Sequence, residues 1–296
     1  MILDELPIHA PSWLPNNVVY LTIMGSFAYG VTSESSDLDL YGICLPPKDL
    51  CFPHLRGEIP NFGKSTGNFL QWSEHHISHK EKEYDVTVYS IIRYFDLCLG
   101  CNPNMIDSLF TSEHCILHIT PIGQKIRENR RLFLSSKCWH TFKGYAWQQC
   151  KKLDRKPEGK RSAIVEKYGY DTKYASHIFR LLDECDQLLT TGDLILGRNR
   201  EEMKAIREGF WTLEHVKEEM NTRLTSMESL YSKSVLPYSP DEEKIKSLLL
   251  ECISMHYEKI ENFVYTVDPR DRALREIESS LSRLDKELYG DINNEI

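Results

Sequence analysis

The chain has 296 residues, 41% hydrophobic and 27% charged, and is long enough to bury one large core or two smaller ones. It has no run of about 18 uncharged apolar residues, and its first residues lack the basic start and apolar stretch of a signal peptide. Nine cysteines at irregular spacings fit free thiols in a reducing compartment better than a disulfide framework. Composition therefore predicts a cytoplasmic protein without a membrane span.

The net charge of −8 is unevenly distributed along the chain. Residues 151–180 contain nine basic and four acidic residues, so this segment carries +5 and the remainder −13. A basic segment in an acidic protein suits a local polyanion, either a triphosphate or a nucleic-acid backbone. A solvated lysine-rich loop explains the same composition, and charge alone does not separate the two interpretations.

The first hundred residues alternate β-rich segments with turn signals. Buried runs or period-two patterns predict three strands, over residues 18–26, 36–47 and 84–91. Residues 52–80 are polar and rich in Gly and His, which predicts an irregular segment. Residues 91–100 show a helical period that ends at Gly100.

Beyond residue 100 the pattern is helical. The predicted helical segments are residues 120–153, 173–191, 198–232 and 241–266. An apolar stripe over 271–290 predicts a helix that packs on the preceding ones. The predicted fold class is α+β, with a mixed sheet and flanking helices in a catalytic domain over 1–119, followed by a helical substrate-binding domain over 120–296.

The segment from Gly25 to Gly42 carries the chemistry. Asp37 and Asp39 are one residue apart in a predicted strand, so both carboxylates project from one face. Two adjacent carboxylates repel each other unless a cation lies between them, and Mg²⁺ binds such carboxylates together with substrate phosphate oxygens. This pair predicts a site for Mg²⁺ or Mn²⁺.

Two further features complete the predicted site. Gly25 and Ser26 precede a short segment that can begin a helix, where free backbone N–H groups and a small hydroxyl suit a triphosphate. A third carboxylate is needed for a second metal, and Asp85 on the polar face of the next alternating strand is the preferred candidate. Glu83 and Asp107 are the alternatives to Asp85.

These motifs resemble those of the DNA polymerase β superfamily of nucleotidyltransferases. The strings GSFAYG, SDLDLYG, YDVTVY and NPNMIDSLF resemble in particular the predicted nucleotidyltransferases associated with RNA ligases and RNA repair. The resemblance implies that Gly25 and Ser26 hold phosphates and that Asp37, Asp39 and Asp85 ligate the metals. The chain departs from the pattern at Cys101, where the relatives favour glycine, and at Asp107, where glutamate is more usual.

The helical half supplies cationic candidates. Lys173, His177 and Arg180 share one predicted helix face, opposite an apolar stripe. Related enzymes present such groups to the incoming nucleotide, which implies phosphate contacts for Lys173 and Arg180, although a solvated helix face gives the same pattern. Tyr170 is a packing residue or a platform for a base.

Two other clusters carry less specific signals. Cys98 and Cys101, with His114 and His118, have zinc-finger spacing, but no basic residue lies between Cys101 and His114 and the interior apolar positions are wrong, so we do not predict zinc. The histidines of the polar segment suit either substrate contact or a surface loop, and they are His75, His76 and His79.

The predicted reaction is transfer of a nucleoside monophosphate from an NTP to a hydroxyl, with two metal ions and an RNA 3′ end as acceptor. Nucleotidylation of a protein side chain is an alternative that salt-dependent RNA binding would separate. An inactive nucleotide-binding protein is a second alternative, which the intact Asp-x-Asp pair with Gly-Ser argues against.

Overall fold

The computed structural model describes residues 2–33, 36–59, 63, 67–153 and 162–257. The chain divides into two units, of which one comprises residues 1–46 and 68–256 and the other residues 47–67 and 257–296. In the second unit the described elements are α3 (Lys48–Cys51) and η2 (Pro53–Arg56), and the Tyr257 hydroxyl lies 3.3 Å from the Cys51 sulfur. The predicted apolar helix over 271–290 lies outside the described residues.

A five-stranded mixed sheet forms the N-terminal part of the first unit. Its strands are β1 (Val18–Ile23), β2 (Leu38–Cys44), β3 (Gln71–His79), β4 (Lys82–Ser90) and β5 (Ile116–Ile119). They lie in the order β3-β4-β2-β1-β5, with β2 and β4 parallel and the other neighbours antiparallel. Leu21, Leu40, Val86 and Val88 are fully buried and share one face by the strand register, which places a core on that face.

Helices alternate with the strands in the first part of the chain, and beyond β5 the described elements are all helices. In the first unit, those before residue 120 are η1 (Ile2–Asp4), α1 (Leu14–Asn17), α2 (Gly25–Ala28), α4 (Ile91–Leu99), α5 (Pro103–Phe110) and η3 (Glu113–Cys115). Those after it are α6 (Pro121–Glu128), η4 (Arg130–Phe133), α7 (Cys138–Leu153), α8 (Ser162–Tyr168), α9 (Thr172–Thr191), α10 (Arg200–Arg207), α11 (Leu213–Ser232) and α12 (Glu242–His256). None of these described helices is long and apolar enough to cross a membrane.

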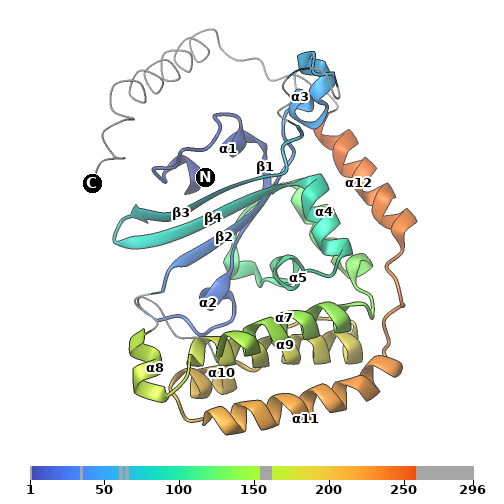
Figure 1. Ribbon diagram of the computed structural model, residues 1–296. Helices are drawn as coiled ribbons and strands as arrows, with labels where there is room; N and C mark the ends of the chain where they lie inside the picture. The colour runs from blue at the N-terminus through green and yellow to red at the C-terminus, as the bar shows by residue number, and fades with distance from the viewer. Residues whose placement is uncertain (1, 34–35, 60–62, 64–66, 154–161, 258–296) are drawn as a thin grey trace. The chain divides into compact units, whose positions relative to one another are not determined.

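The predicted α+β order is confirmed. All strands of the described chain precede residue 120 and only helices follow it there. Helix α9 is the centre of the helical half, packed by α7 on one side and by α10 and α11 on others (Figure 1). The predicted domain boundary at residue 120 stays a prediction.

The prediction of an irregular segment over 52–80 is wrong at its C-terminal end, where β3 forms. A bulge between Glu74 and Ile77 shifts the β3–β4 register, and His76 has φ +58°. Because a bulge adds one residue, it interrupts the period-two pattern by which a strand is recognised. The four-residue strand β5 was also not predicted.

Candidate active site

The parallel pairing of β2 and β4 brings two predicted carboxylates together. Asp39 is the register partner of Asp85, and Asp37 immediately precedes β2. Register partners in neighbouring strands point to the same side of a sheet, so the carboxylates of Asp39 and Asp85 share one face. Asp37 is exposed, whereas Asp39 and Asp85 are half-buried.

The electrostatics of Asp39 reflect this crowding. Burial raises the pKa of Asp39 above its ordinary value, and the neighbouring carboxylates of Asp85 and Asp37 raise it further. Lys173 opposes them by lowering the pKa of Asp39. The ionised form of Asp39 is therefore costly in the protein alone, and a bound cation would remove that cost.

Gly25 fits closely against Asp39. Its φ is +60°, and a Cβ atom built on it would lie 1.8 Å from Oδ2 of Asp39. The backbone N–H of Met24 donates to the Asp39 carbonyl oxygen at 2.7 Å, which fixes the start of α2 beside the carboxylate. A residue without a side chain is thus required where the chain passes Asp39. Ser26 follows as a half-buried residue of α2.

The bulge in β3 turns two histidines toward the carboxylates. The backbone N–H of His76 donates to Oδ1 of Asp85 at 2.8 Å, and Nδ1 of His75 lies 3.4 Å from the same oxygen. The His76 ring pairs with Glu83, which raises the pKa of His76. Sequence reasoning missed this arrangement, because the bulge hides the strand that carries both histidines.

The donor set suits a hard divalent cation. Among the residues described, no three His, Cys, Asp or Glu side chains are already gathered as a metal site. Nonetheless Asp37, Asp39 and Asp85 all offer carboxylate oxygens, and the charges of Asp37 and Asp85 act on the partly buried carboxyl group of Asp39. Oxygen donors of this kind are the ligands that Mg²⁺ and Mn²⁺ prefer, so the residues fit the predicted metal.

A pocket of about 240 Å³ adjoins Asp39. Its wall is formed by β2, α5, α7, α9 and the turn that contains Gly25. The lining residues are Met24, Gly25, Tyr29, Asp39, Tyr41, Asn104, Tyr145, Gln149, His177, Arg180 and Leu181. Two of the predicted nucleotide contacts on α9, His177 and Arg180, therefore lie on the same pocket as the carboxylate. Lys173 is exposed on the first turn of α9.

Residues 5–239 match the model of the RNA repair pathway DNA polymerase beta family. The chain belongs to this family. The predicted resemblance to polymerase β-type nucleotidyltransferases of RNA repair is thereby confirmed. No curated protein matches the chain. A nucleotidyltransferase-like protein from Exiguobacterium sibiricum 255-15 is similar over 82% of this chain and 75% of its own, with 10% identity and a TM-score of 0.28.

The Asn-Pro-Asn segment at residues 102–104 lies at the start of α5 and is hydrogen-bonded to α7. The Asn102 side chain caps α5 by accepting from the N–H groups of Asn104 and Met105, and its Nδ2 donates to the Tyr145 hydroxyl at 2.9 Å. Cys101 has φ +50°, a left-handed conformation that glycine adopts at least cost. The cysteine therefore adopts a backbone conformation at this position that would cost glycine less.

A buried polar cluster joins the Gly-Ser segment to the helical half. Nη1 of Arg180 donates to the Tyr29 hydroxyl at 2.8 Å and to Glu184 at 3.1 Å, and it also pairs with Asp107. The Tyr29 hydroxyl donates to Oδ2 of Asp107 at 2.7 Å. Burial raises the pKa of both Asp107 and Glu184, against the effect of Arg180. Asp107, the alternative to Asp85, is therefore already engaged.

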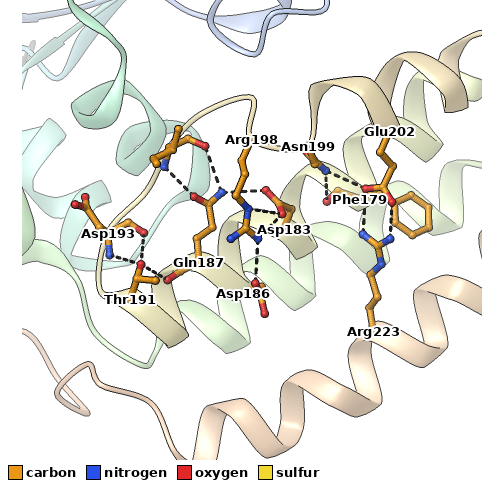
Figure 2. Close-up of polar contacts among 11 residues, drawn as sticks. Phe179, Asp183, Asp186, Gln187, Thr191, Asp193, Arg198, Asn199, Glu202 and Arg223 are labelled. Carbon is orange, nitrogen blue, oxygen red and sulfur yellow. Dashed lines mark hydrogen bonds and ion pairs between the residues drawn. The ribbon is translucent and has the colours of Figure 1, made fainter.

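Helix α9 is fixed from its other side by ion pairs (Figure 2). Arg198 contacts Asp183 and Asp186 of α9, while Arg223 of α11 pairs with Glu202 of α10. Nδ2 of Asn199 donates to the carbonyl oxygen of Phe179 at 3.2 Å. These contacts hold α10 and α11 on α9 and so support the helix that carries His177 and Arg180.

Tyr170 and two of the residues with zinc-finger spacing have partners elsewhere in the fold. Tyr170 is buried and its hydroxyl donates to the Trp211 carbonyl oxygen at 2.7 Å, which fits the packing interpretation. Cys98 and Cys101 are buried, and the Cys101 thiol lies 3.5 Å from the Ser135 hydroxyl. His118 contacts the Val18 carbonyl oxygen at 3.2 Å.

Proposed function

We propose that the chain transfers a nucleoside monophosphate from an NTP to the 3′ hydroxyl of an RNA, with release of pyrophosphate. One observation carries the proposal: Asp39 lies on the pocket wall beside Gly25 and opposite Asp85 in the sheet. An inactive binding protein gains nothing from like charges crowded at the edge of a pocket. Family membership supplies the reaction class.

The predicted residues would have separate roles in binding the metal and the triphosphate. Asp37, Asp39 and Asp85 would hold Mg²⁺ or Mn²⁺, and the bound metal would favour ionisation of the acceptor hydroxyl and neutralise charge on the leaving pyrophosphate. Gly25 and Ser26 would contact the triphosphate at close range.

Helix α9 would add the cationic side of the triphosphate site. The buried Nε of Arg180 has no hydrogen-bond partner among the residues described, which leaves one donor of a pocket-lining guanidinium available. Lys173 already acts on the charge of Asp39. We therefore place Lys173, His177 and Arg180 on the nucleotide, with Arg180 as a donor to phosphate oxygens.

RNA is the proposed acceptor because the family is described by RNA repair and because the segment around Lys151 and Lys152 is basic. Phosphate contacts from such residues give affinity without sequence preference. Part of this basic segment, residues 154–161, lies outside the described residues.

The proposal is tested by incubating the chain with each α-³²P-labelled NTP, Mg²⁺ or Mn²⁺, and total RNA, beside an Asp37→Ala/Asp39→Ala control. Label transferred to RNA by the wild type alone is the expected result. If label enters only protein, the acceptor is a protein and not RNA. Absence of transfer to either would contradict the proposed reaction.

A further inference from the structure

Two carboxamide side chains line the pocket from helices that the proposed chemistry does not use. Asn104 lies in the first turn of α5, and Gln149 lies on α7 one turn after Tyr145. Both are half-buried, and neither side chain has a hydrogen-bond partner within the described parts of the chain. A half-buried amide without a partner in a pocket is suited to hydrogen-bond a ligand.

The backbone around both amides is held in place. Asn102 caps α5 two residues before Asn104, and its Nδ2 donates to the Tyr145 hydroxyl on α7 at 2.9 Å. The two carboxamides therefore project from helices that are joined at this point. A ligand group that bonds to both would meet a pre-formed arrangement, which lowers the entropic cost of binding.

The carboxamides of Asn104 and Gln149 suit a different part of the nucleotide from the residues proposed to contact phosphate. A carboxamide offers a donor and an acceptor side by side, which matches the edge of a nucleobase. A triphosphate has only acceptors and is better matched by Arg180, His177 and backbone N–H groups. The aromatic rings of Tyr41 and Tyr145 line the same pocket and offer faces on which a base can stack.

We propose that Asn104 and Gln149 hydrogen-bond the nucleobase of the bound NTP and determine which NTP is preferred. This inference rests on the proposed function, because it assumes that the pocket holds an NTP. It assigns the base to the α5–α7 side of the pocket and the triphosphate to the side formed by Gly25 and α9. Because a carboxamide can hydrogen-bond the edges of several bases, the identity of the preferred base is to be measured with the four NTPs.

The test is calorimetric binding of each of the four NTPs, and of inorganic tripolyphosphate as a base-free probe, in the presence of Mg²⁺. Asn104→Leu and Gln149→Met remove each amide with little change of shape, and Gln148→Met is the matched control, since Gln148 is exposed on the same helix. Circular dichroism establishes that each variant is folded.

We expect the wild type to prefer one NTP, and each pocket variant to bind that NTP about five- to a hundredfold more weakly. Binding of tripolyphosphate should not change, and Gln148→Met should match the wild type. Unchanged NTP preference in both pocket variants would overturn base recognition and leave the transferase proposal standing. Equal weakening of tripolyphosphate would also overturn it, since the amides would then act on phosphate. A wild type that binds neither NTP nor tripolyphosphate would overturn both proposals.

Discussion

At Gly25 the backbone passes so close to the Asp39 carboxylate that no side chain fits between them. The built Cβ lies 1.8 Å from Oδ2 of Asp39, and φ is +60°. We expect Gly25→Ala to displace the carboxylate and abolish nucleotide transfer, with a loss of stability of about 1–3 kcal/mol from backbone strain alone. Transfer assays and urea unfolding measure the two effects.

Gly169→Ala is the matched control for this change. Gly169 has φ +81° with nothing within 4 Å of the built Cβ, so it carries the strain without the collision. A loss of transfer as large as that of Gly25→Ala would show that strain, and not contact with Asp39, is responsible.

Asp39 gives a pH-dependent prediction for the metal-free protein. Burial and then Asp85 raise the pKa of Asp39 above its ordinary 3.8, so the folded chain binds this proton more tightly than the unfolded chain. The contribution of Asp39 to stability should therefore fall as pH rises from 3.8 through the raised value. Asp39→Asn has no such proton to lose.

In thermal melts with EDTA, Asp39→Asn should accordingly be more stable than the wild type at pH 7, and the difference should disappear below pH 3.8. Mg²⁺ should raise the melting temperature of the wild type and have little effect on the variant. A variant that is less stable at pH 7 without metal would refute this view of Asp39.

Residues with a motif around them could be predicted, and residues without one could not. Asp37, Asp39, Gly25 and Ser26 occur in a dense pattern of fixed spacing, and the family resemblance that this pattern indicated is confirmed. The roles of these four residues stay predictions. The approach of His76 to Asp85 depends on a bulge in β3, which leaves no periodic trace in the sequence.

Among the elements, α9 performs two tasks with one face. Arg180 lines the pocket and also compensates the buried carboxyl groups of Asp107 and Glu184. Arg180→Met leaves both carboxyl groups unpaired, and we expect it to lower the free energy of unfolding by about 3–5 kcal/mol. Urea denaturation at pH 7 measures it.

Asp107→Asn provides the contrast within the same cluster. Arg180 keeps Glu184 at 3.1 Å, so no charge is left unpaired, and the expected loss is about 0.5–1.5 kcal/mol. Arg198→Met removes a more exposed set of ion pairs and should cost about 0–1 kcal/mol. If Arg180→Met and Asp107→Asn lowered the free energy of unfolding equally, Arg180 would not be compensating two buried carboxyl groups.

The elements differ in how far the sequence predicts them. The polar face of α9 with Lys173, His177 and Arg180 follows from helical periodicity, and so does its apolar stripe. That Arg180 would face Asp107 across 73 positions of the chain does not follow, since Asp107 is a polar residue on an otherwise buried short helix. Long-range pairing of buried charges depends on the packing of α5 against its neighbours, which local patterns do not contain.

For the whole molecule, the uneven charge bears on the choice of acceptor. Because the chain is acidic overall, RNA binding should depend on the basic residues of segment 151–180 and weaken with salt. We expect Lys151→Glu, at the exposed end of α7, to weaken RNA binding and to reduce the slope of log K against log salt by about 0.7. Filter binding of a labelled RNA over a salt series measures this.

Lys244→Glu on α12 makes the same charge change at an exposed lysine outside the basic segment. It should bind RNA more tightly than Lys151→Glu, and NTP binding should be the same in both variants. Equal weakening by the two substitutions would assign the effect to net charge and not to the basic segment.

We infer that Asp37, Asp39 and Asp85 carry out the transfer chemistry at this pocket. Pyrophosphate release from the four NTPs with total RNA tests this inference, compared between the wild type and Asp39→Asn over a Mg²⁺ titration. We expect Mg²⁺-dependent release by the wild type and none by Asp39→Asn, which remains folded. Release at the wild-type rate by Asp39→Asn would contradict it, and so would a wild type that releases no pyrophosphate at any Mg²⁺ concentration.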